Sequence, residues 1–226
     1  MNAQPDPKKA RVVIIEDHPM FRERLAHLIN QEEDMVVCGE ADNARDGLAA
    51  IKRLVPALAI VDLSLKGSGG LELLKDLRAE EIATPVLVLS MHEESVYAER
   101  VVRAGANGYI TKHEASEKVM NAIRTVLAGE IFLEPRVMAR IVKTIADGNK
   151  PAAARAVDRL TDRELAVFEL IGAGQTTREI GSRLRVGLTT VDTYRARIKE
   201  KLGLENAARL QCEATRWVHQ QELSVS

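Results

Sequence analysis

Cysteine is scarce in this chain of 226 residues, which contains only Cys38 and Cys212. The two residues lie far apart in the sequence and do not form a metal-ligand spacing, so we expect reduced thiols and no disulfide framework. Long apolar runs are also missing, and the polar, proline-containing first ten residues do not have the pattern of a signal peptide. The sequence therefore predicts a cytoplasmic protein without a membrane segment.

A strong overall charge is missing as well, since the formal net charge is −1. The charge is unevenly distributed, however. Residues 1–129 contain 16 basic and 20 acidic residues, whereas residues 175–201 contain seven basic and three acidic ones. A basic segment in a nearly neutral protein suggests a local contact with an anionic partner.

Residues 11–129 alternate between strand-like and helix-like patterns. Continuous apolar runs, typical of strands buried on both faces, occur at residues 12–15, 35–38, 58–61, 86–89 and 108–110. The segments between them carry apolar residues at helical spacing. This pattern predicts an α/β fold with a five-stranded, parallel, doubly wound sheet, whose functional crevice lies at the carboxyl ends of the strands.

Polar residues stand at the end of four of these strands. Glu16 and Asp17 follow the first strand, Asp62 the third, Ser90 the fourth and Lys112 the fifth. Each acid alone has a structural explanation, because strands often surface at charged residues. Three acids at one sheet edge, however, need a cation, and Mg²⁺ suits a site of few carboxylates, waters and a phosphate oxygen. An aspartate beside such a metal can act as a nucleophile and form an aspartyl-phosphate.

Together with the motif "GANGYITK", these residues resemble a response-regulator receiver domain of the flavodoxin-like fold. The resemblance implies that Asp62 is the phosphoacceptor and that a sensor histidine kinase is the phosphoryl donor. It further implies a Mg²⁺ site and a switch in which Ser90 and Tyr109 respond to the phosphoryl group and Lys112 pairs with it. The ligands of the metal would be Glu16, Asp17, Asp62 and the backbone carbonyl of Ser64. Four residues after Asp62, where receivers usually have proline, this chain has Lys66.

The last part of the chain has only helical patterns, in "LTDRELAVFELIGAGQTTREIGSRLRVGLTTVDTYRARIKEKLGL". Thr161 and Glu164 form a capping box before the first helix of this motif, and Thr189 or Thr190 is expected to open the third. A short helix, a glycine-containing turn and a longer helix predict a helix-turn-helix. The pattern resembles the LuxR-type DNA-binding domain, and the whole chain resembles the NarL/FixJ family of two-component transcription factors.

We therefore expect four parts in the chain. These are a disordered tail at residues 1–10, a receiver domain at 11–129, a linker at 130–157 and the helix-turn-helix domain at 158–221. Within the linker, residues 134–147 could form one amphipathic helix. The glycine and proline residues that follow are typical of an exposed connection.

A helical wheel of the third helix places Val191 and Ile198 on its inner side. Threonine and alanine on the opposite side suit base edges and thymine methyl groups, while arginine and lysine can hold phosphates. The candidate DNA contacts are Arg178, Arg183, Arg185, Thr189, Thr190, Asp192, Thr193, Arg195, Ala196, Arg197 and Lys199.

Asp192 and the final helix leave alternatives open. LuxR-type domains commonly have lysine at the position of Asp192, and an acid there repels phosphate unless it accepts a hydrogen bond from a cytosine amino group. Either the recognised sequence is unusual, or one domain binds weakly and dimerisation supplies the affinity. By the resemblance, the dimer contact would be Leu210, Ala214, Trp217 and Val218. Alternatively, Trp217 seals the core of its own domain.

The preferred function is a phosphorylation-controlled transcription regulator that binds double-stranded DNA and forms a homodimer when phosphorylated. One alternative is a receiver-regulated module that binds another protein and has weak or no DNA binding. Another is a Mg²⁺-dependent phosphohydrolase that uses Asp62 as its nucleophile. That enzyme would need a second general acid or base and a lid, and only Lys112 and Ser90 accompany the acids, so we expect no enzymatic activity.

Overall fold

The computed structural model describes residues 9–65, 69–91, 94–114, 116–146, 156–157, 159–184 and 186–223 of the chain. The chain divides into two compact units, Met1–Gly148 and Asn149–Ser226. Each unit has its own core and is described by itself.

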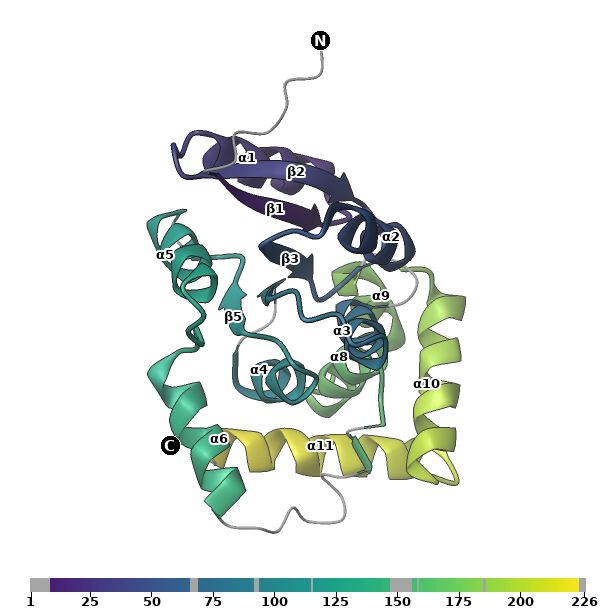
Figure 1. Ribbon diagram of the computed structural model, residues 1–226. Helices are drawn as coiled ribbons and strands as arrows, with labels where there is room; N and C mark the ends of the chain where they lie inside the picture. The colour runs from purple at the N-terminus through teal and green to yellow at the C-terminus, as the bar shows by residue number, and fades with distance from the viewer. Residues whose placement is uncertain are drawn as a thin grey trace. The chain divides into compact units, whose positions relative to one another are not determined.

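The first unit contains the predicted five-stranded parallel sheet, which confirms the α/β fold. Its strands are β1 (Ala10–Ile15), β2 (Met35–Ala41), β3 (Leu58–Asp62), β4 (Val86–Ser90) and β5 (Gly108–Thr111). They lie in the order β2-β1-β3-β4-β5 (Figure 1). All residues of β3 and β4 are buried, because helices cover both faces of the sheet.

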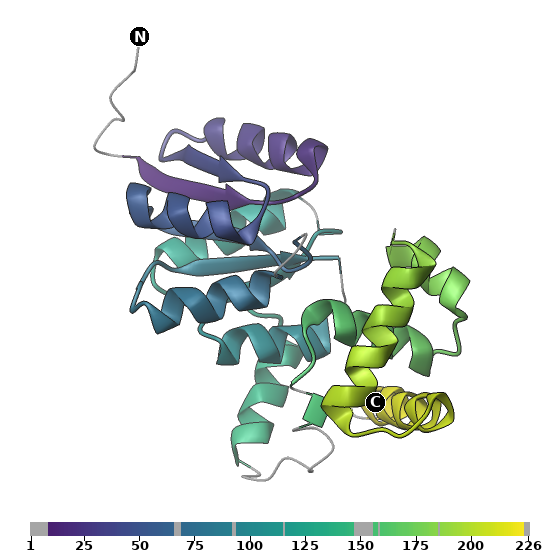
Figure 2. The same ribbon diagram turned by 90° about the vertical axis from the view of Figure 1, so that its right-hand side faces the viewer.

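Five helices cover the sheet. They are α1 (Pro19–Asn30), α2 (Ala44–Leu54), α3 (Gly70–Ala79), α4 (Glu94–Arg103) and α5 (Ser116–Leu127). On one face, α1 and α5 pack their apolar residues on Val12, Ile14 and Leu87. On the other face lie α2, α3 and α4, with α2 against β1 and α4 against β5 (Figure 2). Because all the strand pairs are parallel, the carboxyl ends of the five strands lie at the same edge.

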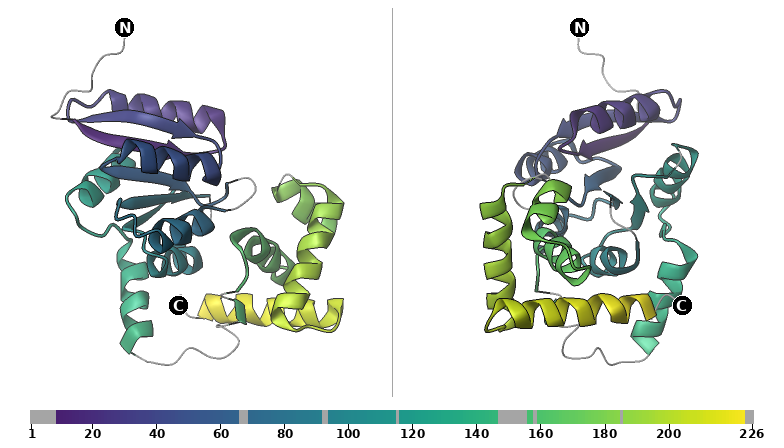
Figure 3. Two further views of the ribbon diagram at one scale, coloured as in Figure 1. Left: turned by 45° about the vertical axis from the view of Figure 1, so that its right-hand side comes forward. Right: turned by 180° about the vertical axis from the view of Figure 1, so that it is seen from behind.

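The segment after α5 extends the first unit beyond its predicted boundary. Phe132 forms a parallel bridge with Gly108. The backbone N–H of Tyr109 donates to the carbonyl of Phe132, and that of Phe132 to the carbonyl of Asn107, both at 3.0 Å. Helix α6 (Pro135–Ala146) follows and contacts α4 (Figure 3). Phe132, expected to belong to a linker, therefore pairs with the edge of β5, which offers unpaired backbone groups there. Helix α6 lies where one helix was expected within the linker, at residues 134–147, and it packs against α4. Residues 147–155 of the expected linker lie outside the described residues.

The other end of the first unit also differs slightly from the prediction. β1 begins at Ala10, so the last residue of the predicted tail belongs to the sheet, where its N–H donates to the carbonyl of Asp34 at 2.8 Å. Residues 1–8 lie outside the described part of the chain.

The second unit is helical. It contains α8 (Asp162–Gly172), α9 (Thr177–Leu184), α10 (Leu188–Leu202) and α11 (Ala207–Leu223). The predicted capping box is present at the start of α8, where the Thr161 side chain accepts from the N–H of Glu164 and the Glu164 side chain accepts from the N–H of Thr161. The Glu164 carboxylate also forms an ion pair with Lys201, whose Nζ lies 2.6 Å from Oε2 of Glu164. This ion pair connects the end of α10 to the start of α8.

Helix α10 starts earlier than the threonines that were expected to open it. Its first residue is Leu188, and Gly187 is the N-cap, without a side-chain hydrogen bond to the helix. Thr189 and Thr190 consequently lie inside the first turn. Sequence preference favours threonine as a cap, but glycine is also accepted at the N-cap, where it leaves the first N–H groups to solvent or to a ligand.

None of the helices in the described part of the chain has the length and apolar character that a membrane span requires.

Candidate functional site

The residues predicted to form a site in the first unit converge at the carboxyl edge of the sheet. Glu16 and Asp17 follow β1 directly, Asp62 ends β3, Ser90 ends β4 and Lys112 follows β5. Because β1, β3, β4 and β5 are consecutive neighbours in the sheet, their ends bring these side chains together. All three acids are buried, and Asp62 is only 1% exposed. We call this group the acidic pocket.

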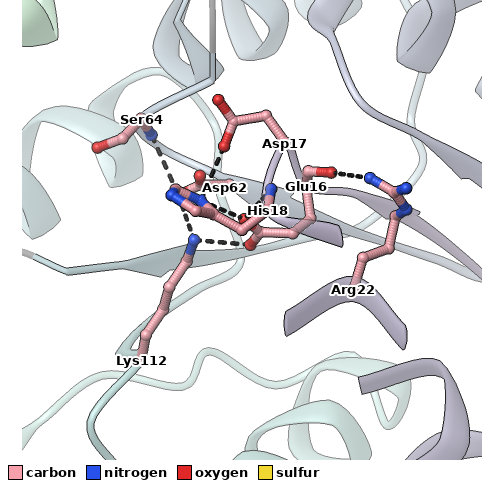
Figure 4. Close-up of polar contacts among 7 residues, drawn as sticks. All are labelled: Glu16, Asp17, His18, Arg22, Asp62, Ser64 and Lys112. Atoms are coloured by element: carbon pink, nitrogen blue, oxygen red, sulfur yellow. Dashed lines mark hydrogen bonds and ion pairs between the residues drawn. The ribbon is translucent and has the colours of Figure 1, made fainter. Parts of the chain in front are cut away.

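Lys112 is the cation of the acidic pocket (Figure 4). Its Nζ lies 2.6 Å from Oε2 of Glu16 and 3.0 Å from Oδ1 of Asp62, and its side chain is 3% exposed. The same Nζ lies 4.9 Å from the centre of the Phe21 ring, a favourable position for a cation above an aromatic face. Its backbone N–H donates to the carbonyl of Ser90 at 2.7 Å, which fixes the chain at the end of β5. The lysine is therefore held between two strand ends.

The acidic pocket raises the pKa of Asp62. Burial, together with the neighbouring Glu16 carboxylate, raises the pKa of Asp62 to about 6, although Lys112 and the backbone N–H of Ser64 counteract that rise. The Ser64 N–H donates to Oδ1 of Asp62 at 3.1 Å. The other oxygen, Oδ2, is buried and has no hydrogen-bond partner among the described residues. Asp62 thus presents one anchored and one uncommitted carboxylate oxygen.

The start of α3 lies unusually close to Asp62. A Cβ atom on Gly70 would stand 2.3 Å from the backbone oxygen of Asp62, far inside the distance that two such atoms tolerate. The Gly70 N–H donates to the carbonyl of Leu63 at 3.0 Å. Only glycine allows α3 to begin this close to the strand, and this packing helps to fix the position of Asp62.

Two residues of this region were not predicted from the sequence as part of the site. His18 is half exposed, and its Nδ1 lies 2.9 Å from Oδ1 of Asp17 and 3.1 Å from Oε1 of Glu16. Arg22 donates to the backbone carbonyl of Glu16 at 2.6 Å and pairs with Glu40 at 3.2 Å. The signal for His18 was its position directly after the two acids. For Arg22 the signal was its place one helical turn further on, where it can reach back to the strand end.

The donor set of the acidic pocket fits a small, hard cation. Ligand atoms from Glu16, Asp17, His18 and Asp62 all lie within 4.8 Å of one another. Three of the four are carboxylates, the ligand type that Mg²⁺ prefers. A cation at this place would also offset the repulsion among the three buried carboxylates.

Of the predicted switch residues, Ser90 belongs to the acidic pocket, and Tyr109 lies on the neighbouring strand β5. Ser90 and Tyr109 are both buried, and they belong to the paired strands β4 and β5, where Tyr109 lies opposite Val88. Through its backbone, Tyr109 is also bonded to Phe132, the residue that leads into α6. The strand that carries Tyr109 thus connects the pocket to the unit's outer edge. Lys66 lies outside the described residues.

In the second unit, α10 divides into an inner and an outer side as the wheel predicts. Val191 and Ile198 are completely buried. The exposed residues of the predicted DNA face are Thr189, Thr190, Asp192, Thr193, Ala196 and Arg197 on α10, with Arg178 and Arg183 on α9. Arg195 and Lys199 are partly exposed, and Arg185 lies outside the described residues. The described candidates are thus exposed or partly exposed on α9 and α10, and their contact with DNA stays a prediction.

The residues predicted as a dimer contact lie in the core of the second unit. Leu210 and Ala214 are fully buried, and Trp217 is nearly so. The Trp217 ring packs edge-on against Phe168 of α8, with 5.8 Å between ring centres. Val218 contacts the same helix, since a Cβ on Gly172 would meet its side chain at 2.6 Å. These side chains pack against α8 within their own unit, and the dimer contact stays a prediction.

Comparison with protein families defines the class of the chain. Residues 12–124 match the family model of the response regulator receiver domain, and residues 158–214 match that of the bacterial regulatory proteins of the luxR family. A receiver sheet with an acidic pocket, followed by a helix-turn-helix unit, is the architecture of a two-component response regulator. The protein is such a regulator, and it binds DNA and regulates transcription.

Individual relatives of the chain define its family within the response regulators. The nitrate/nitrite response regulator protein NarL of Escherichia coli (strain K12) is 32% identical over 216 residues, covering 95% of this chain and 97% of NarL. BvgA of Bordetella pertussis is 30% identical over 200 residues, covering 88% of this chain and 94% of BvgA. The crystal structure of a LuxR-family two-component response regulator from Aurantimonas sp. SI85-9A1 is 30% identical, with a TM-score of 0.56, and covers 61% of this chain and 99% of that one. The chain belongs to the NarL-type response regulators.

Proposed function

We propose that Asp62 is the phosphoacceptor of this regulator and that its phosphorylation controls DNA binding. The observation that carries the proposal is the pairing of two features of Asp62. Its Oδ1 is anchored by Lys112 and by the N–H of Ser64, whereas its Oδ2 has no partner among the described residues. A nucleophilic oxygen has to be free in this way, while the rest of the carboxylate is held in place.

The phosphoryl donor is a sensor histidine kinase. Oδ2 of Asp62 attacks the phosphorus of the donor phosphohistidine, the new O–P bond forms and the P–N bond to the imidazole breaks. Asp62 must be ionised for this attack, and with a pKa of about 6 it is mostly ionised at neutral pH. The Asp62 carboxylate is therefore buried and still ionised, as its role as a nucleophile requires.

Glu16, Asp17, Asp62 and the backbone carbonyl of Ser64 would hold Mg²⁺ beside the accepting carboxylate. Such an ion would supply positive charge to the phosphoryl oxygens. Lys112 supplies a second positive charge, and its present partners Glu16 and Asp62 already hold its Nζ within 3.0 Å of the accepting carboxylate. A phosphoryl group on Asp62 brings nearly two negative charges, which draw this ammonium group toward it.

Ser90 and Tyr109 convert the added charge into a change of shape. The Ser90 hydroxyl turns to donate to a phosphoryl oxygen, and Tyr109 occupies the space that the hydroxyl leaves. Both residues lie on paired strands beside the pocket, so the movement reaches the outer edge of β5. Such a local change of charge and packing biases an element that has two arrangements.

In the second unit, α10 is the recognition helix and enters the major groove. Arginine and lysine side chains of α9 and α10 hold phosphates, while threonine and alanine contact base edges. Phosphorylated chains pair into homodimers, so that two recognition helices reach half-sites one or more helical turns apart. The exposed basic side chains Arg178, Arg183 and Arg197 support this role.

The test is the affinity of the full-length chain for DNA with and without beryllofluoride, a phosphoryl mimic that occupies an aspartyl site with Mg²⁺. The duplex is one that the chain itself selects from a random library. We expect beryllofluoride to tighten binding about tenfold, within the range of typical coupling energies, and to have no effect on the Asp62→Asn variant. Equal affinity of the native chain in both conditions would refute phosphorylation control.

A further inference from the structure

The outer side of the recognition helix carries an unexpected charge. Over its first half the exposed residues include Leu188, Thr189, Thr193 and one charged residue, Asp192. Leu188 is 50% exposed. No other described residue forms a hydrogen bond or an ion pair with the Asp192 carboxylate. Near its N-terminal end, the side that faces DNA in the proposed function therefore carries an acidic group among threonine and leucine side chains.

A structural role for this acid finds little support. Acidic residues stabilise helices when they lie in the first turn, where they meet the positive end of the helix dipole. Asp192 is the fifth residue of α10, which begins at Leu188, and it lies beyond that turn. It forms no ion pair with Arg195, the basic residue that lies three positions further along α10. The carboxylate is thus available to a ligand.

The nearest threonine reinforces the acceptor character of this side. The hydroxyl of Thr193 donates to the backbone carbonyl of Thr189 at 2.8 Å, so its hydrogen is already used within the helix. What Thr193 still offers to a ligand is the lone pairs of its oxygen. Leu188 and Ala196 contribute only apolar surface. A base placed against Asp192 and Thr193 must provide a hydrogen-bond donor.

The four bases differ in what they present to such an acceptor in the major groove. Guanine shows two acceptors and thymine shows one acceptor beside its methyl group, so both repel a carboxylate. Adenine shows an amino donor, but its N7 acceptor lies next to it. Cytosine shows an amino donor without a neighbouring acceptor, which makes it the best partner for an aspartate.

We propose that Asp192 is a specificity residue that selects cytosine by accepting a hydrogen bond from its N4 amino group. This inference depends on the proposed role of α10 as the recognition helix. Binding strength comes from other residues, since residues 175–201 contain seven basic side chains and only three acidic ones. Of these basic side chains, Arg197 is exposed and Arg195 and Lys199 are partly exposed on α10. Affinity and base selection are thereby divided between different side chains of one helix.

The experiment is selection of binding sites from a random duplex library by the full-length chain with Mg²⁺ and beryllofluoride, followed by affinities for duplexes that differ in one base pair. For the native chain we expect one position in each half-site at which cytosine is preferred about tenfold, the size of one good base contact. Asp192→Ala should lose this preference. Asp192→Asn should change it to adenine, because an amide matches the amino group and N7 of that base. The selection of one common base by all three proteins at every position would overturn the proposal.

A control variant separates this outcome from a failure of the proposed function. Glu200 is another exposed acid of α10, and it lies near the opposite end of the helix. Glu200→Gln should keep the preference for cytosine unchanged. If the native chain binds duplexes with strong salt dependence but none of the Asp192 variants alters a base preference, the specificity role is wrong and DNA binding stands. If the native chain binds no duplex, both the specificity role and the proposed DNA contact are wrong.

Discussion

The acidic pocket and the outer side of α10 are both rich in charge, but they use it in opposite ways. In the pocket, five strand-end residues from four strands meet in the interior, and Lys112 is only 3% exposed. On α10, the charged residues come from one helix and lie at the surface. In the acidic pocket, each charged group therefore interacts strongly with its neighbours. On α10, each charged side chain interacts mainly with solvent.

This difference predicts which property of the protein a substitution changes. Electrostatic interactions are strong in the interior, and a charge that loses its partner there is costly. At the surface, solvent and salt screen the same charges. Changes in the acidic pocket should therefore alter both stability and phosphorylation, whereas changes on α10 should alter DNA binding and leave stability nearly constant.

The largest effect is expected from Lys112→Ala. This change leaves the buried carboxylates of Glu16 and Asp62 without a cation, and we expect the free energy of unfolding to fall by about 3 kcal/mol at neutral pH with EDTA present. Urea unfolding measures the loss. Addition of Mg²⁺ should restore part of it, because the ion supplies positive charge to the same oxygens.

Lys118→Ala is the matched control for this substitution. Lys118 also pairs with two acids, Glu114 and Glu134, but its side chain is 35% exposed. Its loss should cost less than about 1 kcal/mol. If Lys112→Ala destabilised the chain no more than Lys118→Ala, the contrast between a buried and an exposed charge network would be refuted.

A smaller effect, of opposite sign, is expected from Asp62→Asn. The pKa of Asp62 is raised from 3.8 to about 6, so the folded chain binds more protons than the unfolded chain between these values. The stability of the native chain therefore contains a contribution that falls as the pH rises through this range. At pH 7, without metal, Asp62→Asn should be more stable than the native chain by about 1–3 kcal/mol. Below pH 4 this advantage should disappear.

The pH dependence is measured by urea unfolding of both proteins in EDTA from pH 4 to pH 8, and the difference between them is the quantity of interest. A constant difference across this range would show that Asp62 has an ordinary pKa in the folded chain. Mg²⁺ should stabilise the native chain and leave Asp62→Asn nearly unaffected.

The smallest effect concerns α10. Arg197→Ala or Lys199→Ala should weaken binding to every duplex, selected or random, by a similar factor. Each should lower the slope of log affinity against log salt concentration by about 1, as the loss of one phosphate contact predicts. Fluorescence anisotropy at several salt concentrations measures the slope, and urea unfolding should show unchanged stability. An unchanged slope in both variants would remove these two residues from the DNA contact.

Much of the first unit could be predicted from the sequence, because its signals are local. Uninterrupted apolar runs define the buried strands, and a parallel sheet necessarily brings Asp62, Lys112 and the acids after β1 to one edge. The capping box of Thr161 and Glu164 is likewise a local signal, and both of its hydrogen bonds are present.

What could not be predicted depends on tertiary contacts that leave no pattern in the sequence. The bridge between Phe132 and Gly108 forms because the edge of β5 is open, which only the strand order reveals. The stripe of α11 that includes Leu210 and Ala214 is equally suited in sequence to a partner chain or to the core of its own unit, and its packing against α8 follows only from the tertiary structure. The contact of His18 with Asp17 depends on the turn that leads from β1 into α1.

The most direct test of the central claim is the intact mass of the chain after treatment with acetyl phosphate. We expect the native chain to gain one phosphoryl group in Mg²⁺ and to gain none in EDTA, and Asp62→Asn to gain none in either. A phosphoryl group on Asp62→Asn in Mg²⁺, or no mass gain in the native chain, would contradict the assignment of the acidic pocket.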